Sequence, residues 1–337
     1  MARVVVIGGG VIGCAVAERL TLDRHQVTLL ERDQLAGHAS GAAAGELSPH
    51  SGAGVVLDEA MRSLAMFPDL VERVERDSGM TVEFHRREAL LPALDEEQAR
   101  VLRSSGGRWL DAAECRSLEP WLTADVLGTV LHEEAHVTPP RLVRALGRAA
   151  ASRGAAVHEG TPVTGFAIDG GAVRQVLTPR GAFDADWVVI AAGPWSKQVA
   201  AWAGASVEVA PQRGQLAALN QGAVSLTRTI FWSTGYLVPK PDGTIIAGST
   251  HEDSGFDERP TVAGVAEMLA FATRLVPALG AATLERTWAG LRPVTPSGEP
   301  VVERVAAVEN LVIATGHHRK GLMLAPGTAE TVAGLLS

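Results

Sequence analysis

The stretch VVVIGGGVIG, residues 4–13, decides the fold. Its β-branched run, residues 4–7, is typical of a buried parallel strand. A glycine-rich turn follows directly, and we expect an amphipathic helix over residues 15–20. This order of strand, turn and helix predicts the first βαβ unit of a dinucleotide-binding domain.

Each glycine of the turn has a distinct role in this interpretation. Gly8 permits the tight turn, Gly10 lets the backbone approach a pyrophosphate, and Gly13 lets the helix lie against the sheet. The phosphates would bind the free N–H groups at the positive end of the helix dipole. NAD and FAD sites share this pattern, so the motif alone leaves the choice between them open.

The second expected strand, residues 25–30, ends in Glu31. A carboxylate at this position is well placed to accept hydrogen bonds from the ribose hydroxyls of an adenine dinucleotide. Its negative charge would repel a 2′-phosphate. The sequence therefore favours NAD or FAD over a cofactor that carries that phosphate.

Two further stretches are rich in small residues. Residues 36–49, AGHASGAAAGELSP, are either a flexible linker or a close-packed segment under a flat cofactor, with the Ser40 hydroxyl as a hydrogen-bonding group. The alanines and the apolar end at Leu47 favour the second interpretation. Residues 185–196, ADWVVIAAGPWS, are a strand that ends in small residues, where a sheet edge would meet the cofactor.

The remaining pattern predicts alternating helices and strands. We expect a hairpin turn at Gly170-Gly171 and place Arg292 and Arg319 in glycine-rich loops. Expected helices cover residues 57–78, which Pro68 kinks or divides, 109–120, 141–151 and 261–276, with another opening at 94–98 and a last one after Pro326. Expected strands cover residues 82–91, 130–137, 155–160, 163–166, 207–219, 229–239, 244–249 and 311–315.

Composition excludes several classes of protein. The net charge of −8 argues against a nucleic-acid partner. The two cysteines, Cys14 and Cys115, indicate neither a disulfide framework nor a zinc site, so we predict no metal. No apolar run approaches the roughly 20 residues that cross a bilayer. Because the first strand begins almost at residue 1, we expect no signal peptide, no membrane insertion and a cytoplasmic location.

The chain resembles the D-amino-acid oxidase superfamily of flavoproteins, and most closely the glycine oxidases of the thiamine-pathway type. The resemblance spans nearly the whole chain. The pieces WAGLRP and GHHR, at residues 288–293 and 316–319, are its most specific parts. Its other markers are residues 8–13, 40–47, 211–215, 235–239, 248–250, 287–293 and 315–321.

The resemblance implies an α/β fold with a Rossmann-like FAD-binding domain and a second, substrate-binding domain built on an antiparallel sheet. We expect the FAD-binding domain at residues 1–80, 138–205 and 286–337, and the substrate-binding domain at residues 81–137 and 206–285. Related sarcosine oxidases attach FAD through a cysteine near the C-terminal motif. No cysteine follows Cys115 here, so we predict non-covalent FAD.

The implied reaction is oxidative deamination of a small amino acid or N-substituted glycine. A hydride passes from the substrate Cα to flavin N5, water hydrolyses the resulting imine, and dioxygen takes the electrons and becomes hydrogen peroxide. A D-amino-acid dehydrogenase that passes electrons to a quinone is the main alternative. An NAD-dependent dehydrogenase and a non-catalytic flavin-binding subunit are two others, and a homo-oligomer stays open.

An amino-acid carboxylate is bound best by planar guanidinium groups, which lysine does not imitate. The resemblance assigns this role to Arg292 and Arg319, with the hydroxyl of Tyr236, the only tyrosine, completing the carboxylate site. Tyr236 is alternatively a packed strand aromatic. His251 either contacts substrate or assists oxygen reduction, or is a solvated histidine at a strand end.

The resemblance also gives a set of residues expected to contact FAD. Three positions depart from the family pattern, namely Glu46, His318 and Lys320, and these leave the substrate open. We interpret His317 and His318 as residues that order the backbone. The expected FAD contacts are Gly8, Gly10, Val11, Ile12, Glu31, Arg32, Ala39, Ser40, Ala43, Ala44, Gly45, Leu47, Val163, Ala192, Gly193, Trp195, Gly290, Arg292, His317, Arg319, Lys320, Gly321, Leu322 and Met323.

Overall fold

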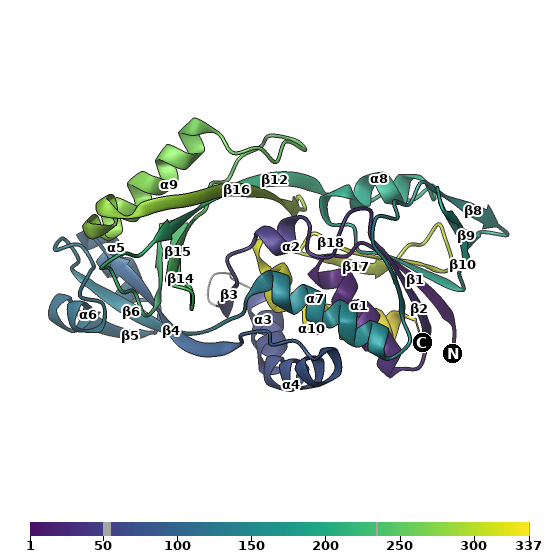
Figure 1. Ribbon diagram of the computed structural model, residues 1–337, viewed down its shortest axis with the longest axis horizontal. Coiled ribbons are helices and arrows are strands. Elements are labelled where there is room, and N and C mark those ends of the chain that lie inside the picture. The colour runs from purple at the N-terminus through teal and green to yellow at the C-terminus, as the bar shows by residue number, and fades with distance from the viewer. Residues whose placement is uncertain (50–54, 234, 337) are drawn as a thin grey trace. The chain divides into compact units, whose positions relative to one another are not determined.

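The computed structural model describes residues 1–49, 55–233 and 235–336 (Figure 1). The chain divides into two compact units, each described here by itself. Unit 1 comprises Met1–Phe84, Val137–Gln212 and Leu291–Ser337, and unit 2 comprises His85–His136 and Arg213–Gly290. Among the described residues, no helix is both long and apolar enough to cross a membrane.

Unit 1 is built on a six-stranded sheet in which every strand except the edge strand β17 is parallel to its neighbours. The predicted strand over residues 311–315 is confirmed with the same bounds. The order across the sheet is β17 (Val301–Arg304), β18 (Leu311–Thr315), β11 (Trp187–Ile190), β1 (Arg3–Ile7), β2 (Gln26–Leu30) and β7 (Ala156–His158).

Three helices, α1 (Val11–Leu22), α7 (Pro139–Ser152) and α10 (Gly321–Leu335), lie side by side in unit 1 (Figure 1). The expected amphipathic helix over residues 15–20 is wrong in two respects. Helix α1 begins at Val11, directly after the glycine turn, and nearly all of its residues are buried. Since α7 and α10 pack against α1 on separate sides, it has no broad face left for polar residues.

A second layer of unit 1 packs on the sheet through β9. The side chains of Val5, Ile7 and Val188 form one buried cluster with Val173 and Val176 of β9. The Gly170-Gly171 turn joins β8 and β9 as predicted. This layer comprises β8 (Gly165–Asp169), β9 (Ala172–Thr178), β10 (Gly181–Asp184), η2 (Gly193–Trp195) and α8 (Ser196–Ala201).

Other elements of unit 1 are short or flank the three helices. The helix expected over residues 57–78 is divided, and Pro68 lies in the first turn of the second helix, where proline is tolerated. These elements are α2 (Ala39–Ala42), β3 (Glu46–Leu47), α3 (Val55–Ala65), α4 (Phe67–Ser78) and η4 (His318–Lys320).

Unit 2 contains a mostly antiparallel sheet with helices on one face. Leu90, Leu237 and Ile245 form a buried core with Ala272 and Leu275 of α9. The strand order is β16 (Thr283–Val294), β12 (Ala210–Asn220), β15 (Thr244–Gly248), β14 (Gly235–Pro239), β13 (Thr229–Trp232), β4 (His85–Ala93) and β6 (Gly128–His136), with β5 (Arg108–Asp111) beside β6. Its helices are α5 (Glu96–Arg103), α6 (Ala112–Leu118), α9 (Val262–Leu275) and η3 (Pro277–Ala281).

Several predicted bounds are wrong. Residues 109–111 form β5, and only the following residues are helical, because Asp111 caps α6 with its side chain. The strand expected over residues 229–239 is the antiparallel hairpin of β13 and β14, and residue 234 within it lies outside the described residues. Arg292 lies in strand β16, not in a loop, and Pro293 fits there because β16 is an edge strand.

The last helix begins at Gly321 and contains Pro326 instead of starting after it. Proline lacks an N–H, so the helix ladder is interrupted at this point. The buried hydroxyl of Ser63 donates to the Met323 carbonyl at 2.6 Å and accepts from the Gly327 N–H at 3.1 Å. These two backbone groups are the pair that bonds in a regular helix, so Ser63 ties α3 to the interrupted turn of α10.

Replacing Ser63 by alanine removes this bridge and leaves two buried backbone groups with weaker partners. We expect the free energy of unfolding, measured by urea titration, to fall by about 1–3 kcal/mol. Ser105→Ala is the control, because it removes an exposed hydroxyl bonded to the Leu102 carbonyl at 2.7 Å. A loss of equal size in both variants would contradict the assigned role of Ser63.

His317 is buried at the start of the same segment, and its Nε2 lies 2.9 Å from the Thr328 hydroxyl of α10. Burial lowers the pKa of His317 to about 4, so the folded protein keeps the ring neutral. The ring thus bonds to a side chain of α10, and the role of His317 in ordering the backbone stays a prediction.

The His317 ring predicts a pH dependence of stability. Its pKa is about 6.5 in an unfolded chain and about 4 in the fold. Its contribution is therefore complete above pH 6.5 and is lost as the pH falls toward 4, by at most about 3 kcal/mol. Urea titrations between these pH values, with excess FAD, should show a shallower decline for His317→Asn than for wild type. Parallel declines would contradict the prediction.

Candidate functional site

Most of the residues predicted to contact a cofactor lie at one edge of the unit 1 sheet. Strands β1, β2, β11 and β18 are parallel, so their carboxyl ends meet at the same edge. The segments that follow these ends are residues 8–12, 31–32, 192–195 and 317–323. The chain leaves β1 toward β2 on one side, and β11 lies on the other, which is the position of ligand sites in open α/β sheets.

Close backbone packing at the end of β1 explains three glycines. Gly8 has a φ of +114°, and a Cβ there would lie 2.4 Å from the Ala191 carbonyl oxygen. A Cβ on Gly13 would lie 1.9 Å from the Gly8 carbonyl oxygen. The predicted reasons for these two glycines, a tight turn and close helix packing, agree with this geometry. Gly9, which received no role from the sequence, would place a Cβ 2.9 Å from the Glu31 side chain.

The first turn of α1 is open to an anion. Its N-cap residue is Gly10, which offers no side-chain acceptor, and no acidic residue lies in that turn. The Ser40 hydroxyl accepts from the Val11 N–H at 3.0 Å, and the Ala36 N–H donates to the Gly9 carbonyl at 3.1 Å. The small-residue stretch after β2 therefore lies against the glycine turn, and its place under a flat cofactor stays a prediction.

The Glu31 carboxylate binds backbone groups at the tip of β2. It is buried, with Oε2 accepting from the Gly9 N–H at 2.6 Å and Oε1 accepting from the Asp33 N–H at 2.8 Å. Each oxygen has a second lone pair for a further donor. Glu31 thus holds the turn of β1 to the end of β2, and its role toward ribose stays a prediction.

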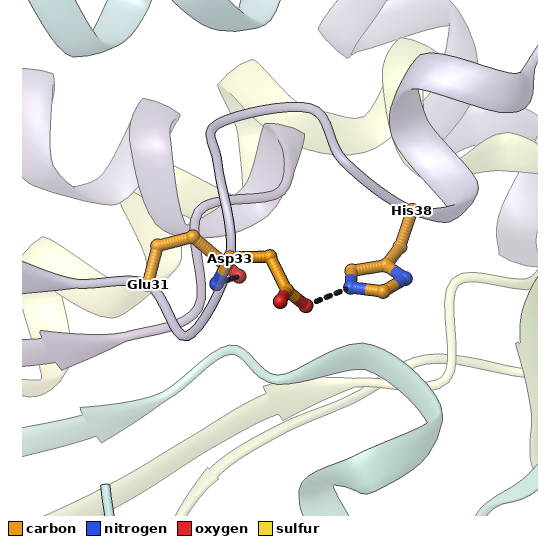
Figure 2. A group of neighbouring side chains, drawn as sticks. All are labelled: Glu31, Asp33 and His38. Carbon is orange, nitrogen blue, oxygen red and sulfur yellow. Dashed lines mark hydrogen bonds and ion pairs between the residues drawn. The ribbon is translucent and has the colours of Figure 1, made fainter. Parts of the chain in front are cut away.

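Glu31, Asp33 and His38 form the one group of potential metal ligands found among the described residues (Figure 2). Asp33 Oδ2 lies 2.8 Å from His38 Nε2 and 3.0 Å from Arg32 Nε. Hydrogen bonds from His38 and then Arg32 lower the pKa of Asp33. The Arg32 guanidinium already pairs with Asp33, and both Glu31 oxygens accept backbone N–H groups. We therefore interpret the cluster as a network of hydrogen bonds and ion pairs and not as a cation site.

Arg32 and Trp195 come together although they are far apart in the sequence. The Arg32 guanidinium carbon lies 3.9 Å from the centre of a Trp195 ring. The centres of the His38 and Trp195 rings lie 4.9 Å apart. The Thr315 hydroxyl donates to the Gly193 carbonyl at 2.8 Å, which holds η2 to the end of β18. Two predicted cofactor residues thus form a flat, cationic surface beside the sheet edge.

The segments that carry the two predicted carboxylate-binding arginines also pack together in unit 1. A Cβ on Gly316 would lie 2.4 Å from Thr295 Cγ2, so the end of β16 lies against the turn after β18. Arg292 is half-buried and Arg319 is exposed. Lys320 donates to the Pro49 carbonyl at 3.2 Å, and burial, followed by the charge of Arg319, lowers the pKa of Lys320.

Tyr236 and His251 lie in unit 2. A Cβ on Gly248 would lie 2.7–2.9 Å from Tyr236 ring atoms and its hydroxyl, so the ring rests on this glycine. Tyr236 and Gly248 are also paired across β14 and β15. His251 follows Gly248 by three residues and is exposed.

Other predicted contacts occupy varied environments. Val163 packs against the core of unit 1, and Leu322 and Met323 are buried in α10. The Gly45 carbonyl accepts from the Val137 N–H at 3.0 Å. Contact with a cofactor stays a prediction for Val163, Gly290, Ala39, Ala43, Ala44, Gly45, Leu47, Gly321, Leu322 and Met323.

The residues at this edge fit FAD. Glycines that admit no Cβ lie beside a helix N-terminus whose N-cap residue, Gly10, has no side chain, which suits a pyrophosphate. Both cysteines are buried and free. Burial raises the pKa of the Cys14 thiol, as expected for a structural residue.

Comparison with known proteins gives relatives that match along nearly the whole of this chain. A bifunctional protein ThiO/ThiG of Synechocystis is 37% identical over 99% of this chain, which spans only 51% of that protein. A glycine oxidase of Bacillus licheniformis is 31% identical, with 98% of this chain and 92% of the relative covered.

The fold agrees with that of solved flavoenzymes. The crystal structure of glycine oxidase from Geobacillus kaustophilus matches with a TM-score of 0.93 and 32% identity, covering 100% of this chain and 95% of that one. This confirms the predicted fold class and the predicted resemblance. The model of the FAD dependent oxidoreductase family, DAO, matches residues 3–335. The chain therefore belongs to the FAD dependent oxidoreductase family, and the predicted dependence on FAD is confirmed.

Proposed function

We propose that this protein oxidises glycine or a small N-substituted glycine, with dioxygen as the electron acceptor. The observation that carries the proposal is the similarity to glycine oxidases over 98% or more of the chain. The flavin family of the chain and the fit of unit 1 to a dinucleotide support it.

The carboxylate of the substrate is assigned to Arg292 and Arg319. Each guanidinium donates two parallel hydrogen bonds to a carboxylate, which fixes the orientation of the Cα–H bond as well as the position of the molecule. The Tyr236 hydroxyl is assigned one further hydrogen bond to the same group. Arg292 is half-buried, so water screens its attraction to a carboxylate less than it screens that of the exposed Arg319.

Bound FAD supplies the acceptor for the hydride that leaves the substrate Cα. The neutral amine loses a hydride from Cα and a proton from nitrogen, which is two electrons and two protons overall, and becomes an imine. Water then converts the imine to an oxo acid and releases ammonia or, from an N-substituted glycine, an amine. Dioxygen takes the two electrons with two protons and leaves as hydrogen peroxide. The protein needs no acid–base pair for this step, because the amine has only to be neutral when the hydride departs.

The oxidase is favoured over the D-amino-acid dehydrogenase because full-length relatives are named glycine oxidases. Dioxygen as acceptor and a small amino acid as substrate are parts of this proposal. The cytoplasmic location and the homo-oligomer stay predictions.

Purified protein tests the proposed activity directly. With bound FAD, glycine or N-methylglycine should bleach the flavin without oxygen and yield one hydrogen peroxide per substrate with oxygen. Iminodiacetate and D-alanine complete the substrate panel. Reduction of an artificial dye without peroxide would favour the dehydrogenase, and no reduction with any amine would contradict both.

Substitution of Arg292 tests the carboxylate site. Because removing one partner of a buried charge pair costs about 2–5 kcal/mol, we expect Arg292→Ala to lower kcat/KM by about 10²-fold or more. Arg292→Lys should recover little, since an ammonium group lacks the planar fork. Tyr236→Phe should lower kcat/KM far less.

The matched control is Arg286→Ala on the same strand, where the guanidinium stacks at 4.5 Å on the Trp288 ring. This variant should keep its turnover. Unchanged amine oxidation in Arg292→Ala would contradict the site assignment even with FAD present.

A further inference from the structure

An extra residue interrupts the pairing of β12 with the chain after β15. The regular ladder ends at the pair Leu216 and Gly248, and the chains pair again at an isolated bridge between Arg213 and Glu252. Between these pairs, residues 214–215 lie on one chain and residues 249–251 on the other. One chain thus carries one residue more than its partner between the two pairs, which makes this a β-bulge.

This bulge changes which face of the sheet each later side chain occupies. Paired residues share a face and successive residues alternate, so Tyr236, Gly248 and Leu216 lie on one face. Arg213 and Gln215 lie on the opposite face, and so does Glu252, the bridge partner of Arg213. Without the extra residue, Glu252 would share the face of Gly248.

The opposite face is the one covered by α9. A Cβ on Gly264 of α9 would lie 2.2 Å from the Gln215 amide nitrogen, and a Cβ on Gly235 would lie 2.8 Å from the Phe271 ring of α9. His251 precedes Glu252 in the bulged segment, residues 249–251, and follows by three residues the glycine on which the Tyr236 ring rests. The bulge therefore carries an exposed imidazole close in the chain to the support of the predicted substrate-binding tyrosine.

A set of buried hydrogen bonds fixes both neighbours of His251. We call Arg213, Gln215 and Glu252 the clasp. Glu252 Oε1 accepts from the Gln215 amide at 2.6 Å, and Glu252 Oε2 accepts from Arg213 Nε at 3.0 Å and also pairs with its other nitrogen. On the other side of His251, the Thr250 hydroxyl accepts from the Gln215 N–H at 3.0 Å.

The clasp also holds the chain that follows. Arg213 donates to the carbonyls of Asp257 and Arg259, and the Gln215 amide exchanges hydrogen bonds with Thr261. Arg213 and Gln215 are almost fully buried. Burial would raise the pKa of Glu252, but hydrogen bonds from Thr250, Arg213 and Gln215 outweigh it and lower the pKa. Glu252 is therefore charged and held in place near neutral pH.

We propose that the clasp is a positioning device that holds His251 three residues beyond Gly248, the glycine on which the Tyr236 ring rests, so that the imidazole contacts the bound amino acid. This inference rests on the proposed function. His251 is the residue that touches substrate, and Arg213, Gln215 and Glu252 act through it. The clasp accordingly determines how tightly the substrate binds and leaves the hydride transfer itself almost unchanged.

A double-mutant cycle on the FAD-loaded protein tests the proposal. Glu252→Ala should raise the KM for glycine about tenfold and change kcat by no more than about twofold. His251→Asn should raise KM to a similar extent. The double variant should match His251→Asn alone, because the clasp has nothing to position once the imidazole is gone. Glu252→Gln, which keeps one acceptor oxygen for Arg213, should recover part of the loss.

Glycolate, a small carboxylate, tests the same variants without turnover. Its affinity is measured from the change in the absorption spectrum of the oxidised flavin as glycolate is added. Glycolate should bind wild type and Arg259→Gln equally, because that control removes an exposed ion pair with Asp257 from the same loop. If Glu252→Ala does not fold, Glu252→Gln and Arg213→Lys replace it in the cycle.

The clasp would be overturned if the fold-changes in KM and in glycolate affinity of the double variant equalled the product of the fold-changes of Glu252→Ala and His251→Asn. A proportional loss of kcat and flavin content in Glu252→Ala would overturn it as well. If wild-type protein bound glycolate but oxidised no amine, the proposed function would be contradicted and the clasp would not be. The glycolate affinities of the variants would still test the clasp.

Discussion

The contact between residue 13 and the turn of β1 constrains the rest of unit 1. The Gly8 carbonyl occupies the space that any side chain on residue 13 would need, so α1 lies directly on the turn. This contact sets where the N-terminus of α1 points. Glu31 then reaches from β2 to the Gly9 N–H, and Ser40 reaches the Val11 N–H. Three separate segments are thus fixed around one helix end, the arrangement that a dinucleotide phosphate requires.

The parts of the fold that follow from local chemistry could be predicted from the sequence. Strand β18, the hairpin at Gly170-Gly171 and the roles of Gly8 and Gly13 depend on short patterns in which each residue has few alternatives. The order of parallel strands then brings residues 31–32, 192–195 and 317–323 to one edge, as the dinucleotide interpretation required. Local periodicity and the topology of α/β sheets suffice for this part.

Other features depend on contacts between distant segments, which no short window contains. Helix α1 is buried because α7 and α10 cover it, and Arg292 lies in a strand because β12 pairs with β16. Gly9 is required by the side chain of Glu31, and the helical state at Pro326 is supported by Ser63 of another helix. In each case the decisive partner is 20 or more residues away.

The two units position side chains by different physical means. In unit 1, parallel strands end together, so residues just beyond their ends gather without any special device. In the antiparallel sheet of unit 2, alternation assigns each paired side chain to a face, and a chain leaving β15 in register would place Glu252 on the face of Gly248, away from α9. One inserted residue reverses that assignment, but it also removes ladder hydrogen bonds that hold the chain. The charged pair of the buried Arg213 and the half-buried Glu252 replaces that support on the covered face, which explains why a bulge and an ion pair occur at the same place.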